Sequence, residues 1–415
     1  MVVIGNIMKI DLKKVFPYTI LLISVSSILQ WCSLPIGNTF LWWLLQSLIL
    51  FIFYKLKPIK YVIRPIKFFF IYLGLSAIYG AVFMTEYYWD WKLLVSNLMI
   101  FSLPLAALVF GNPVYLPKVL KCWFKYAWII LILLMPFLSS DAYGRFLVPF
   151  TFLGLFITHL NKKYVILTII AYLITITFGS ASRSDMLKFS VCLILGVSML
   201  FSFLWKNKKV IWGIAVSMII APIIFFILGV TGNFNIFNIE EELGLEGKYE
   251  IKSSEGGEYS ALSDTRTFLY VEELQSAINN NYIILGRSIA RGYDSASFGD
   301  WMDKAMGIKR GERQSCETSI LNVFNYFGIV GVIIYFTIFF RASFLAIRRS
   351  RNVFLPVIGV YVSFRWLFAW IEDFSRFDLN YLFLWIFIGI CYSPIFRNMS
   401  NQDFKNWLYK IIRWK

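Results

Sequence analysis

The stretch that decides the fold is VIWGIAVSMIIAPIIFFILGVT, residues 210–231, which carries no charged side chain. A helix of about 20 apolar residues crosses a bilayer hydrocarbon core of about 30 Å, so this stretch is long enough to span one. The following segment is different, because residues 232–317 hold 15 of the 24 acidic residues. The change predicts a membrane-spanning helix that ends at a large loop outside the membrane.

The composition extends this prediction to the whole chain. Of the 415 residues, 59% are hydrophobic and 19% are aromatic, and the mean hydropathy is +0.67. Only 15% are charged, whereas soluble domains have roughly 25%. A soluble fold could not bury so much apolar surface, which excludes a cytosolic enzyme, a disordered chain and a secreted disulfide scaffold. We therefore predict an all-α polytopic integral membrane protein.

About twelve apolar stretches predict about twelve transmembrane helices. Nine fall within residues 1–231, a large loop follows over residues 232–317, three more helices fall within residues 318–396, and residues 397–415 form a basic tail. The shortest stretch, 146–160, has fewer residues than a straight span needs. The stretches are 17–34, 39–56, 68–85, 93–110, 120–138, 146–160, 164–180, 186–205, 210–231, 318–340, 353–371 and 379–396.

The charge distribution predicts the orientation of these helices. The formal net charge is +16, which in a membrane protein is typical of basic cytoplasmic connections, so no nucleic-acid partner is expected. Alternate connections carry 25 basic residues and two acids. The opposite short connections and helix ends carry six basic residues: Lys92, Arg145, Arg183, Lys188, Arg365 and Arg376. This asymmetry predicts that both termini are cytoplasmic and that the large loop lies on the outer face.

The large loop is expected to be a small folded subdomain, because a structureless loop of 86 residues would be unusual. Phe268, Val271, Leu274 and Ile278 recur at helical spacing. They predict an amphipathic helix near residues 264–281. Such a helix could lie on the membrane surface or roof a cavity between the spans.

Arginines near the outer face are the first candidate functional residues, because charge at membrane depth is costly and needs a partner. Arg365 lies in the outer half of the predicted span 353–371, and Glu372 and Asp373 follow it by two helical turns. A structural ion pair explains these residues as well as a binding site does. Arg183 belongs to a tight turn of small residues at the start of the predicted span 186–205. It suits phosphate binding, or it is an interfacial arginine beside a capped turn.

The large loop supplies Arg266, Arg287 and Arg291. Loop arginines are ordinarily solvated charges, but here Gly286 and Gly292 flank the last two and have the character of hinges in a binding loop. Several separated guanidinium groups without a metal-ligand cluster indicate an anion such as a diphosphate.

Glu317 stands where the predicted span 318–340 begins. A carboxylate at a membrane boundary is expected to be partly desolvated, which would suit it for general-base catalysis. The alternative is an acid that favours a helix start. The five cysteines show no metal-ligand spacing, and Cys32 and Cys316, both expected on the outer face, could form a disulfide.

The combination of these motifs resembles the bacterial O-antigen polymerase and ligase superfamily, which includes Wzy-type polymerases and lipid A core ligases. The architecture is similar over the whole chain, with a large outer loop before the last few spans. Ser182-Arg183-Ser184 is similar to the family's Ser-Arg element, and Arg266 through Gly286-Arg287 is similar to its "Arg … Gly-Arg-Gly" stretch. Glu317 to Gly331 resembles its helix with a closing Gly-x-x-Gly.

The resemblance implies glycosyl transfer at the periplasmic face of the bacterial inner membrane. Donor and acceptor would both be oligosaccharides on undecaprenyl diphosphate, which would leave with inversion at the sugar carbon. Arg183, Arg266 and Arg287 would bind the diphosphate, supported by Arg291 and Arg365. No metal or other cofactor is expected, because arginine would do the electrostatic work of a metal. A chain-length regulator protein and membrane lipids are the other partners that the resemblance implies.

One departure from the family favours a polymerase over a ligase. Ligases of this superfamily typically carry an outer-face histidine near the start of the span that corresponds to 318–340, and this chain has Glu317 there instead. Glu317 is therefore the expected base that activates the acceptor hydroxyl. A ligase, a flippase or another transporter and a pure scaffold stay open as alternatives. A transporter usually has charged residues or broken helices near the midplane, and the sequence places few charges there.

Overall fold

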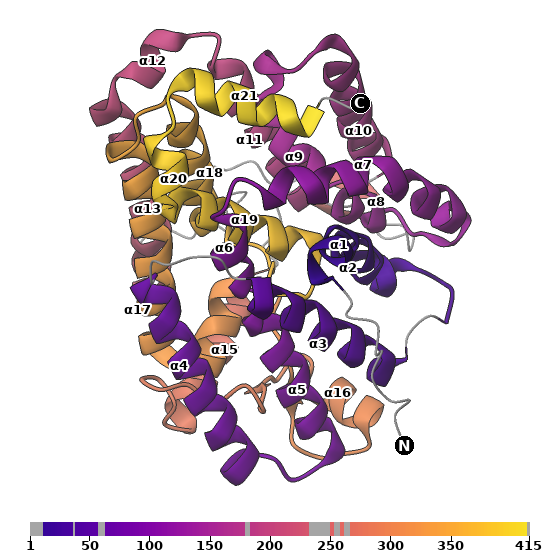
Figure 1. Ribbon diagram of the computed structural model, residues 1–415. Coiled ribbons are helices and arrows are strands. Elements are labelled where there is room, and N and C mark those ends of the chain that lie inside the picture. Colours follow the sequence, from indigo (N-terminus) through magenta and orange to yellow (C-terminus); the bar gives the residue numbers. More distant parts are fainter. Residues whose placement is uncertain are drawn as a thin grey trace, which may run out of the picture.

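The computed structural model describes residues 11–35, 38–56, 63–178, 183–231, 250–252, 258–260 and 266–412. In this part of the chain the fold is helical apart from two short antiparallel ribbons, β1 (Glu250–Lys252) with β2 (Glu258–Ser260) and β3 (Tyr293–Asp294) with β4 (Glu312–Arg313). Figure 1 shows the helices as one bundle.

The α-helices are α1 (Leu12–Val15), α2 (Thr19–Ile28), α3 (Thr39–Leu56), α4 (Arg64–Tyr79), α5 (Tyr88–Ser102), α6 (Leu105–Phe110), α7 (Tyr115–Leu134), α8 (Asp141–Phe146), α9 (Pro149–Gly154), α10 (Lys162–Phe178), α11 (Arg183–Ser198), α12 (Ser202–Lys206), α13 (Lys208–Val230), α15 (Thr267–Asn279), α16 (Gly299–Met306), α17 (Ser319–Arg348), α18 (Phe354–Phe368), α19 (Leu379–Tyr392), α20 (Pro394–Asn398) and α21 (Asn401–Ile412). Short turns η1 (Phe16–Tyr18), η2 (Leu29–Trp31), η3 (Gly80–Met84), η4 (Met135–Phe137) and η5 (Ile157–His159) extend or join several of them.

Seven helical segments of the described chain are long and apolar enough to cross a membrane: Leu12–Trp31, Thr39–Leu56, Arg64–Met84, Tyr88–Phe110, Tyr115–Phe137, Lys208–Val230 and Ser319–Arg348. Two shorter apolar helices, α18 and α19, are packed among them and almost completely buried. The structure therefore has the character of an all-α membrane protein.

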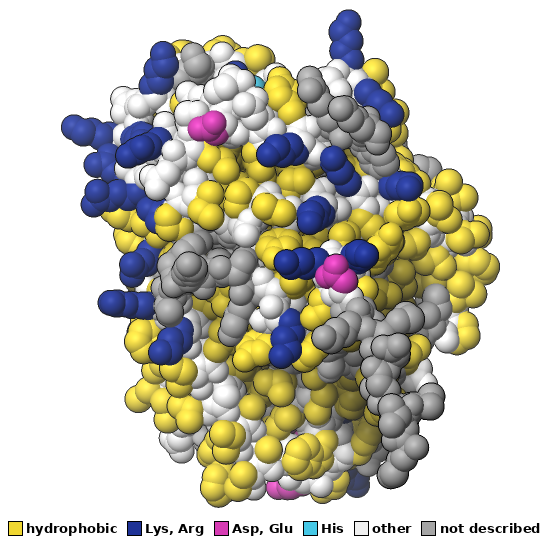
Figure 2. Space-filling view, viewed as in Figure 1, with side chains coloured by type: hydrophobic (Ala, Val, Ile, Leu, Met, Phe, Trp, Pro, Cys, Tyr) yellow, Lys and Arg dark blue, Asp and Glu magenta, His cyan; other side chains and the backbone are white. Residues whose placement is uncertain are grey.

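The exposed surface has the same character. Along α4 and η3, the side chains of Phe68, Ile71, Leu75, Ile78 and Val82 recur every three or four residues and are all exposed. They form one apolar stripe along the helix, which water would not favour and acyl chains would. Figure 2 shows apolar side chains over much of one face, with basic side chains gathered towards its upper part.

The bundle has two distinct ends. At one end, the Phe16 and Tyr115 rings lie 5.1 Å apart, and the Trp407 indole donates a hydrogen bond to the Pro113 carbonyl (2.7 Å). The first and last described helices thus meet the same α6–α7 corner, and we call this the terminal end. Residues 266–318 lie at the opposite end, which we call the loop end. α21 and α16 mark the two ends in Figure 1.

The stretch 146–160 is not a single helix, as a straight span would be. It consists of α8, α9 and η5, and α9 begins with a proline, which has no N–H to continue the helix from α8. The segment still runs the length of α18. Arg145 lies 3.7 Å from Glu372, just beyond the last turn of α18, and the Phe156 ring lies 6.1 Å from that of Phe354 at its first turn.

The predicted amphipathic helix is present as α15, but its buried face is not the predicted one. Leu269, Glu273 and Ala277 are completely buried. Of the four apolar residues that predicted the helix, Phe268, Val271 and Ile278 are exposed. Val271 and Leu274 line an apolar cavity against α13 and α18. Residues 266–317 of the large loop are folded, with α15, β3, α16 and β4 in order.

Helix α17 is broken where the loop meets it. Gly328 has φ 61° and ψ −164°, which no helical residue adopts. There the N–H of Ile329 donates to the Ile283 carbonyl (2.9 Å), and the Tyr72 hydroxyl, near the middle of α4, donates to the Leu285 carbonyl (2.8 Å). The loop therefore enters the bundle between α4 and α17. Irregular backbone at such depth is tolerated because protein groups satisfy its hydrogen bonds.

Candidate functional site

Two arginines converge on one carboxylate at the loop end. The Arg266 Nη1 lies 2.6 Å from Glu317 Oε2, and the Arg313 Nη2 lies 3.1 Å from Glu317 Oε1. Arg266 is held in place by a second hydrogen bond, from its Nε to the Ile371 carbonyl (3.2 Å). We call Arg266, Arg313 and Glu317 the Glu317 cluster.

The Glu317 cluster does not match the expected desolvated base. The Glu317 side chain is 47% exposed and its two oxygens contact two guanidinium groups. Glu317 is exposed because it lies before α17, in the segment that leads to the helix cap Thr318. The cluster instead presents two guanidinium groups that converge on the place of one anion, which suits carboxylate or phosphate oxygens.

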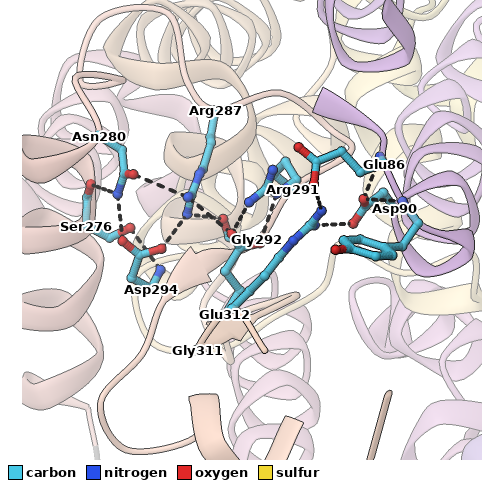
Figure 3. Close-up of polar contacts among 12 residues, drawn as sticks. Glu86, Asp90, Ser276, Asn280, Arg287, Arg291, Gly292, Asp294, Gly311 and Glu312 are labelled. Carbon is cyan, nitrogen blue, oxygen red and sulfur yellow. Dashed lines mark hydrogen bonds and ion pairs between the residues drawn. The ribbon is translucent and has the colours of Figure 1, made fainter. Parts of the chain in front are cut away.

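A second cluster lies deeper in the loop and contains the other two predicted loop arginines (Figure 3). Arg287 contacts Asp294 (2.7 Å) and Glu312 (3.2 Å), and Arg291 forms a two-point contact with Glu312. We call these four residues the Glu312 cluster. Glu312 is only 7% exposed, so both arginines are already neutralised by acids of the loop.

The ribbon of β3 and β4 joins these two clusters. Tyr293 pairs with Arg313, and Asp294 pairs with Glu312. Successive strand residues point to opposite faces. Glu312 therefore points into the Glu312 cluster, while its neighbour Arg313 points towards Glu317, with the Arg313 guanidinium 4.1 Å from the Phe298 ring.

A third contact ties the loop to α5. Arg310 lies 2.8 Å from Asp90 and 2.6 Å from Glu86, and Asp90 also accepts hydrogen bonds from the backbone N–H groups at the start of α5. Figure 3 labels Glu86 and Asp90 beside the Glu312 cluster. The loop is thus tied to α5 by the ion pair between the largely buried side chains of Arg310 and Asp90.

The glycines beside Arg287 are close-packing positions and not hinges. Gly286 has φ 79°, and a Cβ there would lie 2.4 Å from the Phe327 nitrogen. A Cβ at Gly292 would lie 2.1 Å from the Arg313 carbonyl oxygen. Only glycine allows the two backbones to approach so closely, so these residues hold the loop against α17 and β4.

Glu273 is a buried acid that the sequence analysis did not single out. It is 0% exposed, and both carboxyl oxygens lack a hydrogen-bond partner among the described residues. Burial raises the pKa of Glu273 well above its ordinary value, although Arg287 partly opposes the shift. Burial without a described hydrogen-bond partner therefore disfavours the ionised form of this carboxyl group.

Arg365 is separate from the loop arginines. It is 1% exposed, with its guanidinium 5.0 Å from the Phe374 ring. No acid in the described part of the chain lies within ion-pair distance of it, and its Nε and Nη2 lack described hydrogen-bond partners. The acids expected to pair with it have other partners: Glu372 contacts Arg145, and Asp373 contacts Arg376.

The remaining predicted residues fall elsewhere. Arg183 begins α11, but its side chain and residues 179–182 before it lie outside the described part of the structure. Cys32 and Cys316 are both free, and burial raises the pKa of the Cys316 thiol to about 11. No three His, Cys, Asp or Glu side chains of the described residues converge as a metal site.

An apolar cavity of about 300 Å³ opens next to the Glu317 cluster. Helix α13 contributes one wall through Phe226 and Val230, and α15 contributes Val271 and Leu274. Ile371, whose carbonyl accepts the Arg266 hydrogen bond, lines the cavity as well. An apolar cavity at the end of a candidate membrane helix thus lies beside the backbone that holds Arg266, and no side chain of the Glu317 cluster lines it.

Sequence reasoning missed Arg313 and Glu312, although both left a signal. Arg313 and Glu317 are four residues apart, the spacing of a local ion pair. Glu312 is the one acid between the arginines at 310 and 313, which indicates a charged ribbon. The partners of Arg287 depend on the pairing of β3 with β4, which the sequence alone does not specify.

No protein-family profile matches this chain, and neither the curated proteins nor the solved structures include one that is significantly similar to it.

Proposed function

We propose that the chain polymerises oligosaccharide repeat units carried on undecaprenyl diphosphate, at the outer face of the bacterial plasma membrane. In this proposal the chain crosses the membrane about twelve times, both termini are cytoplasmic, and the loop end faces the periplasm. The basic excess of the connections near the terminal end supports this orientation.

The course of the segments supports the count of twelve. The broken stretch 146–160 runs the length of α18, as described above. Similarly, α19 begins with its cap Asp378 at the loop end and ends where the Ser393 hydroxyl donates to the Gly111 carbonyl (2.6 Å) at the terminal end. Helices too short to be straight spans on their own thus still connect the two ends.

One observation carries the proposal: the apolar cavity opens beside the Glu317 cluster. A polyprenyl diphosphate is a long apolar chain with an anionic head. Its first isoprene units would occupy the cavity between α13, α15 and α18, and its phosphates would meet Arg266 and Arg313. Burial of apolar carbon and charge-assisted hydrogen bonds would then act at opposite ends of one ligand.

The proposed reaction is a single displacement. A hydroxyl oxygen of the acceptor sugar bonds to the donor's anomeric carbon while the bond from that carbon to the diphosphate oxygen breaks. The electron pair of that bond goes to the departing undecaprenyl diphosphate, whose charge Arg266 and Arg313 stabilise. The hydroxyl proton passes to the Glu317 carboxylate and then to water. The phosphates would replace the Glu317 carboxylate as the partner of Arg266 and Arg313, which would leave the carboxylate able to accept this proton.

The other predicted arginines receive different roles in this proposal. Arg287 and Arg291 position the loop through Glu312 and are not direct phosphate ligands. Arg365 is too buried to meet a diphosphate without a rearrangement of α18. Arg183 stays a candidate ligand by virtue of its place at the start of α11.

The test is a gene deletion in the bacterial host, with the surface polysaccharide displayed on a gel. We expect the deletion strain to show a single repeat unit in place of the long ladder. The wild-type gene should restore the ladder, and so should Lys309→Ala, an exposed control in the same loop. Arg266→Ala, Arg313→Ala and Glu317→Gln, at equal protein level, should each fail to restore it.

Other patterns would contradict the proposal. If every repeat disappears and lipid-linked units accumulate on the cytoplasmic face, the chain is a flippase. Long polymers that stay on the carrier lipid would identify a ligase. Full polymerisation by the Glu317→Gln variant would remove Glu317 as the base.

A further inference from the structure

We propose that a pocket between α2, α3 and α5 binds a sugar residue of the substrate oligosaccharide; this inference rests on the proposed function. The pocket has a volume of about 300 Å³ and lies at the loop end. We call it the Trp42 pocket. Its lining residues include Gln30, Trp42, Trp43, Gln46, Lys92 and Arg376.

The lining has the chemistry that a sugar needs. A pyranose ring has an apolar C–H face and a rim of hydroxyl groups. The half-buried indoles of Trp42 and Trp43 supply flat apolar surfaces. The Gln46 amide supplies donors and an acceptor, and the Gln30 amide supplies donors, because its oxygen already accepts from Arg376. Adjacent sugar hydroxyls require such groups. Among the described residues, Gln46 forms no hydrogen bond, so its amide is available to a ligand.

The walls of the pocket are held in place before any ligand arrives. The Trp43 indole donates to the Ser96 hydroxyl (3.2 Å), and Arg376 donates to the Gln30 side-chain oxygen. The turn that carries Arg376 is fixed to α2, because the Ser26 hydroxyl donates to the Phe377 carbonyl (2.8 Å). Such preorganisation lowers the entropic cost of binding.

The charges of the pocket favour a ligand with many oxygen atoms. The Lys92 ammonium has no acid within ion-pair distance among the described residues and lies 4.6 Å from the Trp89 ring. The one acid of the lining, Asp378, is 2% exposed and accepts the backbone N–H of Tyr381 at the start of α19. The charge that the pocket offers to a ligand is therefore basic. A prenyl tail would leave these groups unsatisfied, whereas the cavity beside α13 offers it an apolar wall.

The Trp42 pocket is joined to the Glu317 cluster by one short turn, residues 371–378. Arg266 donates to Ile371 at the start of this turn, and Arg376 lines the pocket near its end. Between them, the Phe374 N–H donates to the Ser319 hydroxyl (2.8 Å), two residues after Glu317. A sugar chain attached to a diphosphate at the Glu317 cluster would therefore extend across this turn towards the pocket.

The test measures two ligands separately by titration calorimetry on the full chain in lipid nanodiscs. One is the host's repeat-unit oligosaccharide, released from its lipid by mild acid, and the other is farnesyl diphosphate. Trp42→Ala and Gln46→Ala should raise the Kd for the oligosaccharide by about tenfold or more and leave the Kd for farnesyl diphosphate unchanged. Arg266→Ala should raise the Kd for farnesyl diphosphate and leave the Kd for the oligosaccharide unchanged.

Trp301→Ala, which removes a highly exposed indole on α16, is the matched control and should bind both ligands as the wild type does. Thermal unfolding checks that each variant is folded, and Gln46→Ala serves if Trp42→Ala is not. The inference is overturned if the wild type does not bind the oligosaccharide at millimolar concentration, or if both pocket variants bind it unchanged.

Failure of the proposed function would look different. If the deletion strain keeps its polysaccharide ladder, the polymerase is wrong, yet oligosaccharide binding that depends on Trp42 and Gln46 would uphold the pocket. If the ladder is lost but the pocket variants bind sugar normally, the pocket is wrong and the polymerase stands.

Discussion

Burial separates the roles of two neighbouring carboxylates, Glu312 and Glu317. Glu312 is buried and shared by two guanidinium groups, and removing one partner of a buried pair typically costs about 3–5 kcal/mol. Glu317 also contacts two guanidinium groups, but it is half exposed, and exposed pairs contribute about 1 kcal/mol or less. Glu312 therefore fixes the loop, while Glu317 can exchange its partners for a substrate at little cost.

At the same scale, Glu273 predicts a pH dependence of stability. Its pKa is raised in the folded state by burial, so the folded chain binds this proton more strongly than the unfolded chain does. Folding is then favoured below the unfolded pKa, near 4.5, and becomes less favourable as pH rises, by at most about 1.4 kcal/mol per pH unit. Glu273→Gln should therefore show a shallower fall in thermal stability between pH 5 and 8.

Tm in detergent at each pH is the measurement, and Asp300→Asn is its control because Asp300 is an exposed acid on α16. The control should keep the wild-type slope. The groups that face Glu273 are Arg287, Asp294 and Tyr282, and none of them is altered. Equal slopes for Glu273→Gln and wild type would mean that Glu273 is ionised in the fold.

At the scale of elements, the contact between the loop and the break in α17 predicts that glycine-to-alanine substitutions differ in their effect on the stability of the loop. Gly286→Ala should destabilise the loop by more than about 1 kcal/mol, because the new Cβ meets the α17 backbone and φ is positive. Hydrogen exchange of residues 282–292 should accelerate accordingly.

Gly74→Ala, in the interior of α4, is the matched control. A Cβ there meets nothing within 4 Å, and alanine is the better helix former by up to about 1 kcal/mol. It should leave exchange in the loop unchanged. Equal protection of the loop in both variants would show that the close approach at Gly286 is dispensable.

Helix α15 shows how far periodicity carries a prediction of an element. Apolar spacing predicted a helix near 264–281, and the structure has it at Thr267–Asn279. The buried face was missed because Glu273 and Ser276 are buried while Phe268 and Ile278 are exposed. Next to a membrane, apolar side chains can face outwards, so periodicity finds the helix but not the direction of its core.

For the whole molecule, the stretch 146–160 predicts a pattern of chemical labelling. If this broken segment crosses the membrane, Ser139 and Asn161, both exposed, lie on opposite sides. In a chain whose own cysteines are replaced by serine, Ser139→Cys should react with an impermeant maleimide in intact cells. Asn161→Cys should react only after permeabilisation.

Lys309→Cys in the large loop and Lys118→Cys on α7 calibrate the two sides. They should behave as Ser139→Cys and Asn161→Cys do, respectively. If Ser139→Cys and Asn161→Cys react alike, the segment does not cross, and the count of twelve is wrong.

The fold class was predictable from the sequence, whereas the contacts within the candidate site were not. Apolar runs predicted the all-α membrane character, because the membrane imposes length and composition on each helix separately, and seven described segments meet these conditions. Site contacts depend on partners far apart in the chain, as with Arg145 and Glu372 or Arg266 and Glu317. Only the tertiary structure brings such residues together, so their identity as charged residues was predictable and their pairing was not.

The ribbon of β3 and β4 has a consequence for how this chain can change in length. Adjacent residues of opposite charge, Glu312 and Arg313, serve clusters on its two faces. Inserting or deleting one residue before them would exchange these faces. Arg313 would then join Arg287 and Arg291, and Glu312 would face Glu317. Repulsion on both sides would oppose such a change, so electrostatics helps to fix the register of this ribbon.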